Sequence, residues 1–154
     1  MRRTVTVGAV VVVAAVAMGS LAGVGGYTFV YARGWSYLTD DPAACGNCHV
    51  MEEQVTGWLR SSHRSVAVCN DCHTPTGPAK WLAKASNGYH HSSAFTTGRF
   101  PDVIQITPAN LAIVEQRCRG CHSDTVHAMD AARPADRTPC TTCHARVGHA
   151  NRDD

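Results

Sequence analysis

The segment Cys45-Gly46-Asn47-Cys48-His49 contains the pattern C-x-x-C-H, which governs the organisation of the whole chain. The pattern occurs four times, at residues 45–49, 69–73, 118–122 and 140–144. In this signature of c-type haem attachment, the two thiols bind the haem covalently and the histidine binds its iron. The sequence therefore predicts four c-type haems. The attachment residues are Cys45, Cys48, Cys69, Cys72, Cys118, Cys121, Cys140 and Cys143, and the motif ligands are His49, His73, His122 and His144.

Other uses of paired cysteines fit this pattern less well. C-x-x-C pairs also form zinc sites and thioredoxin-like dithiols, and eight cysteines are enough for four disulfides. None of these sites needs a histidine directly after the second cysteine, yet all four motifs have one. A zinc-bound or disulfide-linked binding module would also be colourless, so visible haem absorbance distinguishes it from a cytochrome.

A long apolar run precedes the first motif. Residues Thr4 to Ala32 include no charged side chain over 29 positions, which exceeds the roughly 20 residues that a membrane-spanning helix needs. Arg2 and Arg3 precede the run, so the positive-inside tendency predicts a cytoplasmic N-terminus. Aromatic residues typical of a membrane interface gather at its far end: Tyr27, Phe29, Tyr31, Trp35 and Tyr37.

The same run favours an uncleaved anchor over a secretory signal. Ser20-Leu21-Ala22 resembles a cleavage site, but the apolar run continues to Val30, whereas signal h-regions span about 7–15 residues. We therefore expect a single-pass protein of the cell membrane, with an anchor at residues 1–33 and an extracytoplasmic (periplasmic) haem domain at residues 34–154. A soluble carrier released by cleavage is the alternative, and the mass of the mature protein distinguishes the two.

Beyond the anchor, the chain is predicted to be mostly α-helical with much irregular loop. Strand signals are few, and proline, caps and apolar spacing indicate short helices. So much loop in so small a domain predicts a thin hydrophobic core that large apolar cofactors complete. The predicted helices are one from Pro42 into Cys45, one over Met51–Arg60, one over Pro78–Ser86 closed by Asn87-Gly88, and one capped by Thr107 that runs from Pro108 towards Cys118, while Ser92–Thr107 is predicted to be irregular.

The spacing of the motifs indicates an internal duplication. The first cysteines of the first two motifs lie 24 residues apart, and those of the last two lie 22 apart. A longer interval of 49 residues separates the second motif from the third. The sequence thus predicts a compact, internally duplicated tetrahaem domain in which each half holds two haems in close contact.

The second axial ligands are sought among the remaining histidines, because haems used only for electron transfer tend to be six-coordinate. His63 and His149 are the first candidates. His127 follows its motif histidine by five residues, as His149 does, and is a runner-up, as is His91. Met51 lies two residues after His49, and its thioether is an alternative to that histidine as the ligand of the first haem.

Charge composition adds two inferences. The formal net charge of +2 is too small to indicate nucleic-acid binding, and Arg2 and Arg3 account for it. The chain has twelve arginines but only two lysines, Lys80 and Lys84, spaced i, i+4. Because lysine, unlike arginine, can lose its proton, a lysine close to a haem is a candidate contact for a quinol and its proton, and a solvated helix face is the alternative.

These features together resemble the NapC/NirT/NrfH family of membrane-anchored tetrahaem quinol dehydrogenases. The resemblance rests on the anchor, the four motifs and Met51, and it covers nearly the whole chain. The short length, Lys84, His91-Ser92 and Phe95-Thr96-Thr97-Gly98 make the chain most similar to the small subunits of cytochrome c nitrite reductases.

The resemblance implies a set of ligands and a quinol site. Met51 would bind the first haem in place of His49, and Lys84 would contact menaquinol. His73 would bind the second haem, with a lysine of the catalytic subunit as its other ligand, and the remaining pairs would be His122 with His149 and His144 with His63. Some relatives place an aspartate at the first haem, but no aspartate occurs between Asp71 and Asp102.

The implied function is electron transfer from menaquinol, through four haems, to an extracytoplasmic pentahaem nitrite reductase that forms ammonia. The alternative is a quinol dehydrogenase of the same family that serves a nitrate, N-oxide or other reductase. The third possibility, that the chain itself reduces a small molecule, is weakened because no C-x-x-C-K motif occurs. On the leading interpretation, the terminal reduction belongs to a partner.

Overall fold

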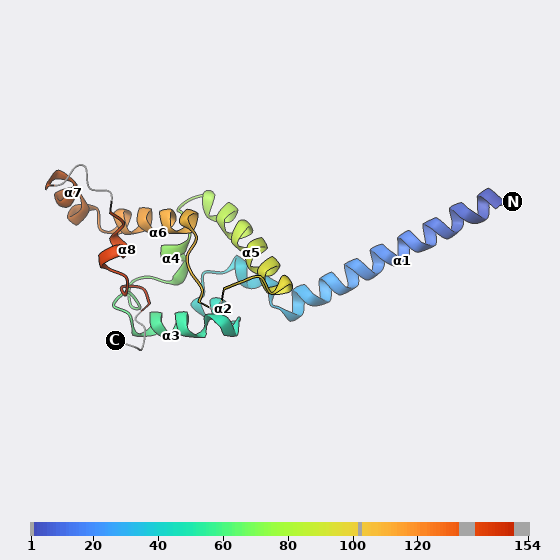
Figure 1. The fold of residues 1–154 in the computed structure, drawn as a ribbon, viewed down its shortest axis with the longest axis horizontal. Helices are drawn as coiled ribbons and strands as arrows, with labels where there is room; N and C mark the ends of the chain where they lie inside the picture. The colour runs from blue at the N-terminus through green and yellow to red at the C-terminus, as the bar shows by residue number, and fades with distance from the viewer. Residues whose placement is uncertain (1, 102, 133–137, 150–154) are drawn as a thin grey trace. The chain divides into compact units, whose positions relative to one another are not determined.

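The computed structural model describes residues 2–101, 103–132 and 138–149, with side chains from Thr6 onward. The chain divides into two compact units, Met1–Ser36 and Tyr37–Asp154, which we call the anchor unit and the motif unit. All regular elements in the described residues are helices (Figure 1). The predicted helical fold class is confirmed, while the predicted domain boundary after residue 33 stays a prediction.

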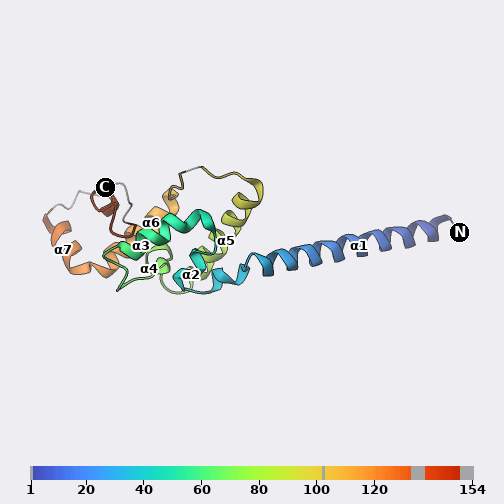
Figure 2. The same ribbon diagram turned by 90° about the horizontal axis from the view of Figure 1, so that it is seen from below.

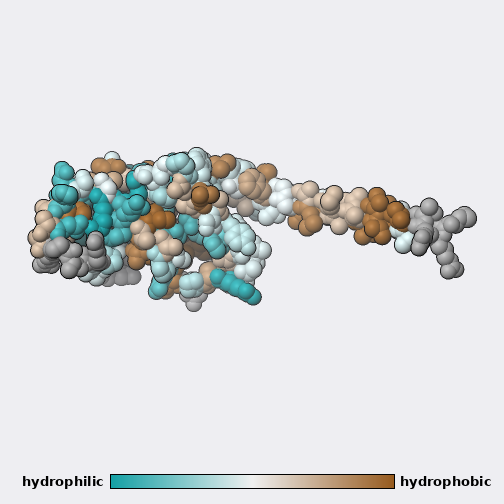
Figure 3. Space-filling model, turned by 90° about the horizontal axis from the view of Figure 1, so that it is seen from above, coloured by the Kyte–Doolittle hydropathy of each residue, from teal (hydrophilic) through white to brown (hydrophobic). Residues whose placement is uncertain are grey.

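The anchor unit consists mainly of α1 (Arg2–Tyr31). Its segment Thr6–Tyr31 is 26 residues long and includes an 18-residue stretch with a mean hydropathy of 2.3, none of which is buried inside the protein. Hydrophobic side chains cover much of its length (Figure 3). The helix is long enough to cross a membrane. The predicted N-terminal apolar helix is therefore confirmed, whereas the side chains of Arg2 and Arg3 lie outside the described residues.

The motif unit is a series of short helices joined by turns and extended segments. Each of the four C-x-x-C-H motifs begins in, ends in or lies within one of them. The elements are η1 (Gly34–Leu38), which begins in the anchor unit, α2 (Pro42–Cys45), η2 (His49–Met51), α3 (Glu52–Arg60), α4 (Cys69–His73), α5 (Ala79–Thr97), α6 (Pro108–Cys121), α7 (Ser123–Ala132) and α8 (Cys140–Cys143).

Two of the predicted helix starts are confirmed in detail. Asp41 accepts a hydrogen bond from the Ala43 N–H at 2.9 Å, and Pro42 occupies the first position of α2. At the start of α6, Thr107 Oγ1 accepts from the Asn110 N–H at 3.3 Å and Pro108 follows. In both helices a side chain caps a free backbone donor, and the missing N–H of proline costs nothing there.

α5 is longer than the sequence predicts. Its predicted end at Asn87-Gly88 is wrong, because both views show one uninterrupted helix that continues to Thr97 (Figure 1, Figure 2). The helix ends instead at Gly98, whose φ of +66° suits glycine. The Asn87 amide oxygen accepts a hydrogen bond from Asn110 Nδ2 at 3.2 Å. This tertiary contact holds Asn87 within the helix, at the position where local propensity predicts a helix end.

The described part of the chain buries no hydrophobic side chain. Its most buried polar side chains belong to Thr74 and Lys84, at 4% and 6% exposure. The predicted thin core is therefore confirmed for these residues. Because burial of apolar surface is the dominant stabilising term in folding, this unit needs another source of buried apolar area.

Glu115 connects the last two motif helices. From α6, its carboxylate accepts from the Cys140 N–H at 2.9 Å and from the Cys140 thiol at 3.0 Å. Arg119 lies one turn further and pairs with the same carboxylate at 3.3 Å. The bond to Glu115, followed by burial, raises the pKa of the Cys140 thiol to about 11. The backbone bond does not need the thiol proton, so it can persist after haem attachment.

Replacement of Glu115 should therefore destabilise the assembled protein. Glu115→Ala leaves the Cys140 N–H without its acceptor, and we expect a loss of about 1–3 kcal/mol in the free energy of unfolding. Glu115→Gln keeps an acceptor and should lose less. Guanidinium unfolding followed by circular dichroism measures both, with the exposed neighbour Gln116→Ala as the control. Equal losses for Glu115→Ala and Gln116→Ala would contradict the role of this bond.

Candidate haem-binding site

The second, third and fourth motifs each form a helical turn. α4 spans the second motif, and in the others the His122 N–H donates to Cys118 O and the His144 N–H to Cys140 O, both at 2.9 Å. Residues at i, i+3 and i+4 share one face of a helix. Both thiols and the imidazole of each motif therefore lie on one side, which is the arrangement needed to attach a haem and bind its iron.

The first motif has a different backbone. α2 ends at Cys45, residues 46–48 form turns and a bend, and His49 begins the 3₁₀ helix η2. Met51 belongs to the same short helix, and its N–H donates to Cys48 O at 2.9 Å. The helical turn that orients the other motif histidines is thus missing here. An open cavity of about 340 Å³ lies beside this motif, lined by Gly46, Asn47, His49, Glu52, Val55 and Thr56.

The motif helices contact one another in sequence order. α2 packs against α4, α4 packs against α6, and α6 packs against α8 (Figure 1). At the first junction, the interaction between the thiols of Cys45 and Cys69 lowers the pKa of Cys45 to about 7 and, followed by burial, raises that of Cys69. At the second, burial and then the charge of Cys118 raise the pKa of Cys72. The four attachment sites therefore form one row.

Two pairs of imidazoles face each other in the motif unit. The ring centres of His63 and His122 are 6.0 Å apart, and those of His73 and His149 are also 6.0 Å apart. Each pair joins a motif histidine to one of the two first candidates for a second ligand. The two ring planes are inclined to each other at 67° in the first pair and at 45° in the second. Two imidazoles on opposite sides of one iron can take such angles, because each ring can rotate about the bond to the metal.

Hydrogen bonds fix the tautomer of both second-ligand candidates. His63 Nδ1 lies 3.1 Å from Val147 O, and His149 Nδ1 lies 2.9 Å from Gln54 O. A carbonyl can only accept, so Nδ1 carries the proton and Nε2 keeps its lone pair. A backbone acceptor on one ring nitrogen is the usual support for a histidine that binds metal through the other.

These residues fit six-coordinate haem iron. A metal ion binds an imidazole nitrogen at about 2 Å, so the centres of two axial imidazoles are about 6 Å apart, as observed in both pairs. The eight thiols are free of disulfides in the structure and stand where c-type attachment needs them. Haem would also provide the apolar area that the side chains lack.

These ring contacts differ from the ligand pairs that the family resemblance implies, and those ligand pairs stay a prediction. His149 lies beside His73 rather than His122, and His63 lies beside His122 rather than His144. The reason is the path of the chain after the fourth motif. It returns to α3 and the following turn, where Gln54 and His63 hold it by hydrogen bonds.

The other candidate ligands are placed as follows. His127 lies exposed on α7, and His91 lies on α5 with its Nδ1 2.9 Å from the Tyr37 hydroxyl. Burial, then the charge of His90, lowers the pKa of His91. Burial also raises the pKa of Tyr37 to about 12, with smaller contributions from Cys48 and Cys45, whose charges haem attachment would remove.

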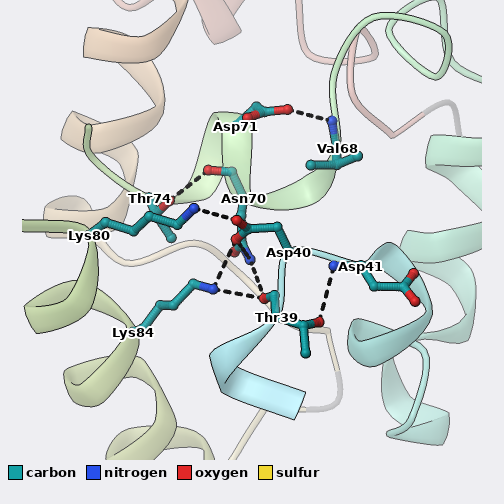
Figure 4. A network of polar contacts seen from close by, with 9 residues as sticks. All are labelled: Thr39, Asp40, Asp41, Val68, Asn70, Asp71, Thr74, Lys80 and Lys84. Carbon is teal, nitrogen blue, oxygen red and sulfur yellow. Dashed lines mark hydrogen bonds and ion pairs between the residues drawn. The ribbon is translucent and has the colours of Figure 1, made fainter. Parts of the chain in front are cut away.

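Lys84 lies in a polar network at the start of the motif unit (Figure 4). Its Nζ donates to Thr39 O at 2.7 Å and pairs with Asp40 Oδ1 at 2.9 Å. Lys80 pairs with the other oxygen of the same carboxylate, and Asn70 Nδ2 donates to Asp40 Oδ1 at 2.8 Å. Sequence reasoning singled out both lysines but missed Asp40. The only signal for it is its position five residues before the first motif.

A comparison with known protein families agrees with this site. The NapC/NirT cytochrome c family, N-terminal region, matches residues 4–153. The chain belongs to the NapC/NirT cytochrome c family. Membership confirms the predicted family and implies c-type haem, while its attachment to the C-x-x-C-H cysteines stays a prediction.

The chain is also similar to a curated protein and to a chain of a solved structure. The chain is 36% identical to the cytochrome c-type protein NrfH of Wolinella succinogenes, and the match covers 79% of this chain and 77% of that protein. Among solved structures, it resembles a chain of the cytochrome c nitrite reductase NrfHA complex bound to the HQNO inhibitor. That match has a TM-score of 0.64 and 30% identity, and it covers 96% of this chain and 90% of the other.

The imidazole pairs predict the spectra of two substitutions. His63→Ala and His149→Ala should each convert one low-spin haem to high-spin, because each removes one axial nitrogen and leaves the covalent attachment intact. Absorbance and electron paramagnetic resonance spectra measure the change. His127→Ala is the matched control and should leave the spectra unaltered. A normal spectrum for either test variant would remove that histidine from the ligand set.

Proposed function

We propose that this chain is the membrane-bound, menaquinol-oxidising electron-transfer subunit of a cytochrome c nitrite reductase that forms ammonia. Electrons would enter at the first motif and pass along the row to the fourth. The observation that carries this proposal is the packing of the motif helices in the order α2, α4, α6 and α8. Such a row suits electron transfer over a distance, because each attachment site adjoins the next.

The residues of the row have separate tasks. Haem, when bound, supplies the one-electron carrier, and the eight cysteines keep it attached. His63 with His122, and His73 with His149, would hold iron on both sides in the middle of the row. These pairs leave no axial position for a substrate, so they suit transfer alone.

At the entry end, Met51 is the proposed ligand in place of His49. The irregular backbone of the first motif supports this, because no helical turn directs His49 as it does the other motif histidines. A first iron bound on one face by Met51 would leave its other face for the quinol side. Lys84, close enough to Cys45 to lower the pKa of that thiol, is the proposed quinol contact.

The surface of α5 suits a lipid-soluble substrate. Lys80 and Lys84 are its only lysine, arginine or acidic residues, and both side chains turn towards Asp40. Trp81, Leu82 and Tyr89 are exposed at 55%, 76% and 71%. An uncharged apolar helix surface beside the proposed quinol contact is what a site open to a bilayer needs.

The exit end would be the fourth motif. Neither imidazole pair includes His144, and an open cavity of about 380 Å³ lies beside it, lined by Ser62, Cys143, His144, Ala145, Arg146 and Val147. The lysine that the resemblance attributes to a catalytic subunit would then serve His144 rather than His73. The similar chain of known structure is part of a cytochrome c nitrite reductase complex, NrfHA, which supports a catalytic partner here.

The proposed location follows from the anchor. Arg2 and Arg3 would keep the N-terminus in the cytoplasm, so residues 34–154 would lie on the extracytoplasmic side, where the partner would also be. In the second candidate function, the chain would pass electrons to a nitrate, N-oxide or other reductase. The residues at the first, second and third motifs would have the same roles, and only the partner at the fourth motif would differ.

An experiment in native membranes tests the acceptor. Under anaerobic conditions, a menaquinol analogue should reduce the haems, and nitrite should then reoxidise them quickly. Deletion of the gene should abolish this reoxidation, as followed by haem absorbance. Reduction without reoxidation by nitrite would keep the quinol dehydrogenase and reject the nitrite reductase as its partner.

Met51 can be tested separately. Met51→Ala should abolish reduction by the menaquinol analogue because the first iron loses its proposed ligand, while all four haems remain attached. Haem content is measured by absorbance, and Met129→Ala, on exposed α7, is the control. Normal turnover of Met51→Ala would show that this methionine only packs.

A further inference from the structure

Asp40 is the meeting point of the only two lysines in the chain. Lys84 pairs with its Oδ1 at 2.9 Å, and Lys80 with its Oδ2. The two lysines are one helical turn apart on α5, so a single carboxylate can bind both. Both lysines of α5 therefore point towards the segment that leads into the first motif (Figure 4).

The Lys84 ammonium is buried and therefore depends on its partners. Its side chain is 6% exposed, whereas that of Asp40 is 47% exposed. A buried charge is costly unless it is paired and hydrogen-bonded. Thr39 O and Asp40 Oδ1 accept two of its three N–H donors, and the Trp81 ring centre lies 5.4 Å from Nζ. One N–H remains for a further acceptor.

The carboxylate itself is held firmly. Asn70 of the second motif donates to Asp40 Oδ1 at 2.8 Å and to Thr39 O at 3.1 Å. Hydrogen bonds from Lys80 and then Lys84 hold the pKa of Asp40 well below its usual range, so the group stays ionised. The next residue, Asp41, caps α2. The network thus fixes Lys84 with respect to the first and second attachment sites.

We propose that Asp40 is a positioning residue of the quinol site, which holds Lys84 as a fixed cation with one N–H directed at a quinol oxygen. The proposal rests on the proposed function and names a residue that neither the motifs nor the lysine pattern identified. Asp40 itself would touch no substrate. It acts through Lys84.

A fixed cation suits the chemistry of quinol oxidation. The quinol gives two electrons to the haems and two protons to water, and its oxygens gain negative charge as the protons leave. A preorganised N–H donor stabilises that charge without reorganisation.

The test measures binding of the quinol-analogue inhibitor HQNO to the full-length holoprotein in detergent, by fluorescence titration. Asp40→Asn should weaken binding by about tenfold or more, as expected for loss of a charge-assisted bond. Lys84→Met should do the same. Asp41→Asn removes an equal charge one residue away and keeps the α2 cap, since asparagine caps as well as aspartate, so its binding should stay within about twofold of the unsubstituted protein.

A double substitution separates positioning from general damage. If Asp40 acts through Lys84, Asp40→Asn should weaken HQNO binding little further in the Lys84→Met background. All variants should keep full haem content and complete reduction by dithionite. Should Asp40→Asn fail to assemble, Asp40→Glu takes its place and must weaken binding only where Lys84 is present.

Three outcomes overturn the proposal. In the first, the Asp40 variant binds HQNO as tightly as Asp41→Asn does. In the second, the Asp40 substitution weakens HQNO binding equally in the presence and in the absence of Lys84. In the third, Lys84→Met binds HQNO as tightly as the unsubstituted protein. The proposed function fails in a different way. In that case the unsubstituted protein itself neither binds HQNO nor is reduced by a menaquinol analogue.

Discussion

Covalent attachment of haem is the constraint on which the structure of the motif unit depends. Its described residues bury no hydrophobic side chain, so the usual driving force of folding is weak before the cofactor is added. Thioether bonds and axial histidines can replace it, in the way that a structural metal contributes its binding free energy to folding. The short length of α4 and α8 follows from this constraint, because each needs only enough length to present two thiols and an imidazole on one face.

Polar contacts hold the attachment sites in position, a role that a hydrophobic core has in most domains. Glu115 joins α6 to α8, and Asn70 joins α4 to the segment before α2 through Asp40 and Thr39. Arg117 of α6 donates to Asp71 O of α4 at 2.7 Å. Each contact links one motif to the next, so the row of sites is fixed by directed bonds that connect neighbours in the sequence of motifs.

Much of this arrangement could be predicted, and the features that the sequence did not predict have a common cause. The anchor, the motif ligands and the caps Asp41 and Thr107 are local signals, and local chemistry decides them. The length of α5 depends on contacts with distant segments, which override the helix-ending tendency of Asn87-Gly88. The imidazole pairs and the role of Asp40 are also long-range. His149 and His63 follow their motifs at spacings that fit several partners, and only the return of the chain to α3 selects between them.

The two ends of the row differ from its middle in a way that suits exchange with other molecules. In the middle, each iron would have an imidazole on both sides, with the tautomers fixed by Val147 O and Gln54 O. At the ends, His49 follows an irregular turn, His144 belongs to neither pair, and both lie beside open cavities. A carrier needs closed sites within it and open sites where electrons enter and leave. The entry end is distinguished further, because among the described residues only there does the fold bury an ammonium, that of Lys84, against a carboxylate. On the proposed function, proton-coupled chemistry would belong to the first site and plain electron transfer to the others.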